Sequence, residues 1–124
     1  MAVRRRTDPA AGRLAVSAWR DGADDRSTVT TAVRFTLEEI ADVAPGHAVE
    51  VRVPPWGAVQ CVEGPRHTRG TPPNVVETDP QTWLELVTGT VSWADAVADG
   101  RVSASGERSD ISALLPLQAV RNRG

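Results

Sequence analysis

The polar side chains best suited to chemistry gather in one short segment, Gly64–Asn74, with the sequence GPRHTRGTPPN. Arg66 and Arg69, together with backbone N–H groups near Gly70, could hold an anion such as a phosphate or a carboxylate. Guanidinium groups bind such anions through paired, charge-assisted hydrogen bonds, and clustered backbone N–H groups add to the attraction. The first hypothesis for this segment is therefore an anion site or a contact for a partner.

A second hypothesis for the same segment is catalysis by His67. The imidazole could act as a general base if the carboxylate of Glu63 oriented it. A third is a solvated turn made rigid by its prolines. The glycines match neither a P-loop nor a dinucleotide-binding fingerprint, so they do not decide between the three.

Few other residues could take part in chemistry, and they are separated from one another in the sequence. Cys61 lies among apolar neighbours in a predicted strand, where a buried, unreactive thiol is expected. His47 follows Pro45–Gly46 at a corner and is expected at the surface. One cysteine and two distant histidines lack the spacing of a metal site, and the sequence indicates no cofactor. Trp56 either packs over the sheet edge or forms an exposed contact.

Composition excludes several classes of protein. The net charge of −2 gives no global basic field for nucleic acid. All 14 cationic residues are arginine, which excludes Schiff-base lysine chemistry and a P-loop lysine. A single cysteine excludes an internal disulfide and fits a reducing cytoplasm. The sequence has no signal peptide and no apolar run of a membrane span, so we expect a cytoplasmic protein without integral membrane association; transient membrane contact stays open.

The N-terminal half begins with two helices and continues with strands. We expect residues 1–8 to form a disordered basic tail and residues 9–120 a single domain. Elements and faces are predicted from caps and periodicity. The two helices are Pro9–Arg20, with an apolar face of Leu14, Ala15, Ala18 and Trp19, and Thr28–Ala44. The strands are His47–Val53, Ala58–Glu63 and Val75–Thr78, of which Ala58–Glu63 is expected to be central in the sheet. Between the last two strands, Gly64–Asn74 is expected to be a loop or an irregular edge strand.

The C-terminal half has short helices and one further strand. A helix capped by Asp79 ends at Gly89, and a helix capped by Ser92 ends at Gly100. Arg101–Ser105 alternates as a half-buried strand does, and a short closing helix stops at Pro116. The order predicts an α+β fold with a mostly antiparallel, mixed sheet of about five strands and helices packed on one face.

This pattern resembles the sterol carrier protein family. The shared features are the acidic helix start at Asp79, the glycine at the helix end, the second helix rich in Trp and Ala, and the strand ADGRVSASGE between glycines. More narrowly, the segment Pro54–Pro80 is similar to a bacterial, chiefly actinobacterial, branch of the family. The resemblance extends from about Thr28 to Leu117.

The resemblance implies non-catalytic binding or transfer of an apolar lipid, fatty-acyl or sterol-like, in a cavity between sheet and helices. The short closing helix leaves open a small or filled cavity. In that case the chain would be a protein-interaction module that uses the Gly64–Asn74 loop, and a small hydrolase built on His67 is a further alternative. The matching candidate ligand residues are the apolar ones of the last helices, Leu84, Val87, Trp93, Val97, Leu114, Leu115 and Leu117.

Overall fold

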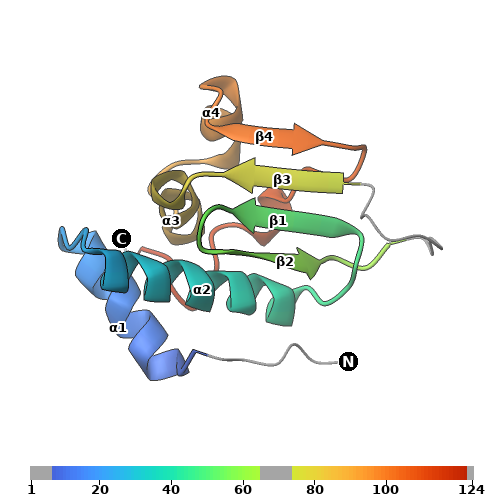
Figure 1. Cartoon of the computed structure of the whole chain (residues 1–124). Coiled ribbons are helices and arrows are strands. Elements are labelled where there is room, and N and C mark those ends of the chain that lie inside the picture. The colour runs from blue at the N-terminus through green and yellow to red at the C-terminus, as the bar shows by residue number, and fades with distance from the viewer. Residues whose placement is uncertain (1–6, 65–73, 123–124) are drawn as a thin grey trace.

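Two capped helices open the fold of the computed structural model, which describes residues 7–64 and 74–122 (Figure 1). Helix α1 spans Pro9–Arg20, the predicted bounds, and α2 spans Arg26–Val43, which begins two residues earlier than predicted. Each begins at an aspartate whose carboxylate accepts a hydrogen bond from a backbone N–H three residues on. These caps satisfy N–H groups that have no partner inside the helix.

The sheet is mixed and mostly antiparallel, as predicted. Its strand order is β2-β1-β3-β4, with β1 antiparallel to β2, parallel to β3, and β3 antiparallel to β4. The expectation of about five strands is wrong, because the described part of the chain forms four. The strands are β1 (Val49–Val53), β2 (Gly57–Cys61), β3 (Asn74–Thr78) and β4 (Val102–Ser105).

Strand β2 lies at the sheet edge, so the prediction that it is central is wrong. The apolar residue that suggested a second buried side, Val62, comes after the strand and has a positive φ of 68°. Its N–H donates to the carbonyl of Ala44 and its carbonyl accepts from the N–H of Ala48, at 2.7 and 2.9 Å. Val62 therefore closes the corner between α2 and β1 and does not extend the strand.

One face of the sheet is buried and the other is polar. Val49, Val51 and Val53 of β1 are fully buried, whereas Glu50 and Arg52 point to the opposite face and form an ion pair. This alternation follows from the two-residue period of a strand. The buried face packs against the helices, and this layered arrangement is the predicted α+β architecture.

Helix α1 docks on α2 mainly through Gly12 and Val16, which the predicted face did not include. Of the predicted face, Ala15 and Trp19 do pack against the core, whereas Leu14 does not. Gly12 and Val16 are its buried residues, and Leu14 is 70% exposed. A Cβ atom at Gly12 would lie 2.2 Å from Cγ of Phe35, so the missing side chain sets how closely the helices approach. Leu14 lies off this contact because it is two residues from both Gly12 and Val16, about half a turn away.

The C-terminal elements begin and end where the caps predicted, except for the last. Helix α3 (Pro80–Thr88) ends at Gly89 in the left-handed conformation, and α4 (Trp93–Ala98) is capped by Ser92. The expected closing helix is only a single 3₁₀ turn, η1 (Ser112–Leu114). Leu115 is extended, which is the conformation that a following proline imposes, so the helix cannot continue.

Two observations concern the predicted tail and membrane contact. Thr7 donates two hydrogen bonds to Glu38 and Asp8 caps α1, whereas residues 1–6 lie outside the described residues. Within the described ranges no helix is both long enough and apolar enough to cross a membrane.

Candidate functional site

A hollow of about 430 Å³ opens between the α3–α4 turn and the chain around η1. One wall comes from the end of α3 and the start of α4. The other comes from η1 and the two residues after it. The lining residues are Leu86, Gly89, Val91, Ser92, Trp93, Ala94, Ser112, Leu115 and Pro116.

The two walls are held together by the backbone. The N–H of Leu117 donates to the carbonyl of Val87 at 2.9 Å, which fixes the chain after η1 against the end of α3. A Cβ atom at Gly89 would lie 3.3 Å from Cγ of Pro116. Gly89 therefore serves twice, because it adopts the positive φ of 83° that ends α3 and leaves room for the proline ring.

The chemistry of this hollow is apolar and uncharged. None of its lining residues carries an ionisable carboxylate, amine, guanidinium or imidazole. Of its two hydroxyl groups, that of Ser92 accepts the backbone N–H of Asp95 as the cap of α4, at 3.1 Å. A concave, mostly apolar surface of this size can bury part of a small apolar ligand.

The structure brings two of the seven predicted ligand residues to this hollow, Trp93 and Leu115. Both are half-buried and pack against the edge of the core. Leu114 is also half-buried at the core edge but does not line the hollow. Val97 is 42% exposed on α4.

The remaining three candidates lie inside the core. Leu84 and Val87 are fully buried on α3, and Leu117 is 2% exposed. Beside them, Trp83 is also fully buried and donates its indole N–H to the hydroxyl of Thr36 at 2.8 Å. The space between α2 and α3 is thus filled by side chains.

Most of the lining residues were missed by the sequence analysis. Leu86, Val91, Ala94 and Pro116 were not considered as ligand contacts. A usable signal was present in the glycine break at Gly89 followed by Trp93. A left-handed glycine between two short helices forces the chain to turn, and a turn leaves concave surface beside it.

The residues of the predicted anion loop lie mainly outside the described part of the chain. Arg66, His67 and Arg69 are among these, so anion binding, partner contact and catalysis there stay predictions. At the end of that loop, Asn74 is described and buried. Its amide donates to the carbonyl of Ala48 and its side-chain oxygen accepts the N–H of Arg108, at 2.7 and 2.9 Å. Asn74 thus fixes the start of β3.

The thiol and the described histidine behave as expected. Cys61 is fully buried, and burial raises the pKa of its thiol to about 11, so it stays protonated at neutral pH. His47 is exposed and shares a 2.7 Å hydrogen bond with Gln60. The described residues contain no group of three His, Cys, Asp or Glu side chains placed to hold a metal ion.

Trp56 packs onto α2 at the edge of the sheet. The guanidinium of Arg26 lies 5.1 Å from the centre of its indole ring, and Nε of Arg34 donates to its carbonyl at 3.3 Å. The ring is half-buried against the core. Of the two alternatives for this residue, the structure supports packing over the sheet edge.

Comparison with known families decides the family of the chain. The model of a family described as "bacterial SCP ortholog" matches residues 25–117, most of the 124-residue chain. The chain belongs to this bacterial sterol carrier protein family. Among curated proteins, no match was found. The apolar hollow of this sterol carrier protein relative lies wholly inside the matched range, whereas α1 precedes it.

Proposed function

We propose that this member of the sterol carrier protein family binds the apolar part of a lipid in the hollow between α3, α4 and η1. The observation that carries the proposal is the lining of this hollow, which has no charged side chain and includes Trp93 and Leu115. Each buried methylene of a ligand contributes about 0.8 kcal/mol. Burying a charged group without a partner would oppose binding. An apolar chain in this hollow buries no such group.

We propose binding or transfer without a chemical step. Ser112 is the lining hydroxyl with a carboxylate beside it, that of Asp110. Hydrogen bonds from the side chain and backbone of Ser112 lower the pKa of Asp110, and a carboxylate of low pKa is a poor general base. The hydroxyl of Ser92 is engaged in capping α4. An unactivated hydroxyl is a weak nucleophile, so the lining supports a container rather than a catalyst.

The test is binding of a dansyl-labelled fatty alcohol, which carries no charge, followed by its fluorescence. Changing Leu115 to Ala should weaken binding about tenfold, because it removes apolar contact worth about 1.4 kcal/mol. Leu14→Ala is the matched control, since Leu14 is exposed on α1 and does not line the hollow. Backbone amide shifts on titration should centre on Val91 and Trp93.

Two results would contradict this proposal. One is an equal effect of Leu115→Ala and Leu14→Ala on the affinity. The other is binding whose amide shifts avoid Val91 and Trp93. Either would place the lipid elsewhere or leave the chain without lipid binding at all.

A further inference from the structure

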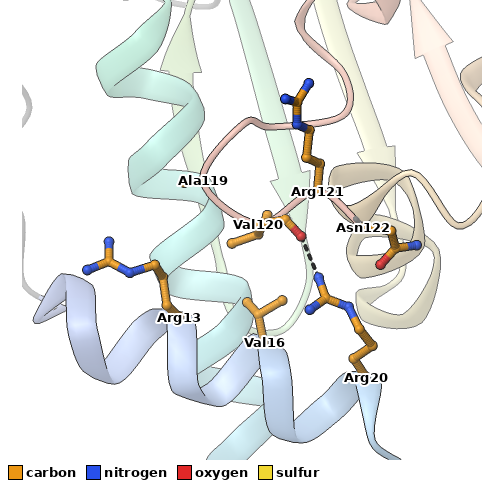
Figure 2. Close-up of a pocket in the computed structure, with 7 residues that line it drawn as sticks. All are labelled: Arg13, Val16, Arg20, Ala119, Val120, Arg121 and Asn122. Atoms are coloured by element: carbon orange, nitrogen blue, oxygen red, sulfur yellow. Dashed lines mark hydrogen bonds between the residues drawn. The ribbon is translucent and has the colours of Figure 1, made fainter. Parts of the chain in front are cut away.

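A second hollow, of about 630 Å³, lies between α1 and the C-terminal segment Ala119–Asn122 (Figure 2). It is separate from the apolar hollow and shares no lining residue with it. Its character is also different, because three of its seven lining residues are arginines. The lining residues are Arg13, Val16, Arg20, Ala119, Val120, Arg121 and Asn122.

The helix side of this hollow has an apolar centre between two cations. Arg13, Val16 and Arg20 follow at i, i+3 and i+7, so they lie on one face of α1. Figure 2 shows the two arginines on either side of Val16, with Val120 facing Val16 across the hollow. Val16 and Val120 are 1% and 5% exposed, so they close the bottom of the hollow. The apolar floor that a ligand can reach consists of the half-buried Ala119 and the methylene groups of the arginines.

The arginines of this hollow have no acidic partner in the described structure. The ion pairs Arg52–Glu50 and Arg101–Glu85 lie elsewhere in the described residues. No lining residue is acidic, although the chain as a whole has a net charge of −2. Arg20 donates one hydrogen bond to the carbonyl of Val120. A guanidinium has five N–H donors, so most of those on Arg20 are left for a ligand.

Both walls of the hollow are fixed before any ligand arrives. On the C-terminal side, Asn122 donates from its backbone to the carbonyl of Thr88 at 2.7 Å and from its amide to the hydroxyl of Thr90 at 3.1 Å. On the helix side, the close contact of Gly12 with Phe35 holds α1 against α2. A preformed site loses less freedom on binding.

We propose that this hollow binds an organic anion, a phosphate or carboxylate group joined to an apolar body. Arg13 and Arg20 hold the anionic group, and the apolar body lies against Ala119 and the methylene groups of the arginines. Guanidinium groups bind both kinds of anion through charge-assisted hydrogen bonds. A bare inorganic anion would leave the apolar floor uncovered. Every lining residue lies outside the matched range 25–117, so this site is an addition to the family core.

The test compares octyl phosphate with octanol and with inorganic phosphate, by backbone amide shifts in the full-length protein. Octyl phosphate should shift the amides of Val16 and Ala119–Asn122, and octanol should not. Inorganic phosphate should bind at least tenfold more weakly than octyl phosphate, because it gains nothing from the floor. These amides are distinct from those of the apolar hollow, so this proposal and the proposed function can fail separately.

Arginine variants identify the contacts. Arg13→Gln, which leaves the bond between Arg20 and Val120 intact, should weaken octyl phosphate binding about tenfold, as expected for one lost charge-assisted interaction. The double variant Arg13→Gln, Arg20→Gln should abolish octyl phosphate binding. Arg108→Gln is the matched control, an exposed arginine beyond β4, and should bind as the wild type does.

Vesicles identify the source of the anion. If vesicles containing phosphatidic acid bind the wild type and not the double variant, the ligand is a membrane headgroup. If only soluble octyl phosphate binds, it is a free metabolite. Both results support the site. Unchanged affinity in the double variant, equal shifts with octanol, or no shift at these amides with octyl phosphate would overturn it.

Discussion

Two tryptophans ten residues apart occupy opposite environments. Trp83 on α3 is fully buried between α2 and the sheet, and its indole N–H is satisfied by Thr36. Trp93 at the start of α4 is half-buried and lines a hollow. The packed seam around Trp83 leaves no room for a ligand, whereas the surface around Trp93 has room for one.

The difference arises from the single glycine between the two helices. Gly89 ends α3 in the left-handed conformation, and the chain turns before α4 begins. Residues before the turn pack against α2, whereas α4 after the turn contacts α3 and β4 and leaves Trp93 at its start beside η1. A change of helix direction therefore separates the part of the chain that stabilises the fold from the part that can bind.

The largest expected effect is loss of the buried indole. Trp83→Ala should cost about 3–5 kcal/mol of unfolding free energy, because it leaves a cavity in a closely packed core. Trp93→Ala should cost no more than about 1.5 kcal/mol, since that ring is only partly buried. Urea unfolding of both variants measures the contrast. Similar losses would mean that the two environments are energetically alike and that the hollow is part of the core.

The next effect concerns added volume. Gly12→Ala should destabilise by about 1–2 kcal/mol, because its Cβ would meet the ring of Phe35, which is buried and cannot move aside. This overlap outweighs the better helix propensity of alanine. In the hollow, Ala94→Val should change stability by about 0.5 kcal/mol at most.

Thermal unfolding of these two variants compares how each region tolerates an added methyl group. A stabilised Gly12→Ala protein would show that α1 is not docked closely on α2. A strongly destabilised Ala94→Val protein would show that the hollow is tightly filled.

The smallest effect is on pH dependence, through the cap of α3, the helix that the two regions share. Burial acts to raise the pKa of Asp79, but hydrogen bonds from Thr82 and the charge of Arg101 hold it below the usual 3.8. A pKa lowered by folding stabilises the folded state above the unfolded pKa, and this contribution is lost as the pH falls below about 4.

Two variants of the cap separate charge from hydrogen bonding. Asp79→Ala should cost about 1 kcal/mol at pH 7, because a helix N-cap is lost. Asp79→Asn keeps an acceptor and should flatten the loss of stability in acid, as measured by urea midpoints between pH 3 and 7. An unchanged acid slope in the Asn variant would mean that other carboxylates control acid unfolding.

Much of the fold could be predicted because local signals and tertiary packing agree. The caps at Asp79 and Ser92 placed helix starts correctly, and the valine alternation placed β1. Strands β1 and β2 pair directly, and the predicted strand at Arg101–Ser105 is β4 of the same sheet. These features depend on hydrogen bonds and periodicities that a few neighbouring residues determine.

The errors came from contacts between distant parts of the chain. The face of α1 depends on how close α2 can come at Gly12, and the position of β2 depends on which strand pairs with β1. No periodicity in the sequence encodes either the approach of the two helices or the order of the strands. The candidate site shows the same limit, because an apolar helix face looks alike in sequence whether a core or a hollow meets it. Leu84 and Leu115 were predicted together, yet one is core and the other lines the hollow.

The bond between Arg20 and Val120 spans 100 residues of sequence. A chain leaving the ribosome can assemble the family core once the residues up to 117 have emerged, but the arginine-lined hollow needs the segment that follows. Its closure is therefore among the last folding events, after long-range contacts elsewhere are formed. Proteolytic trimming just beyond Leu117 would remove the second hollow and leave the first one built.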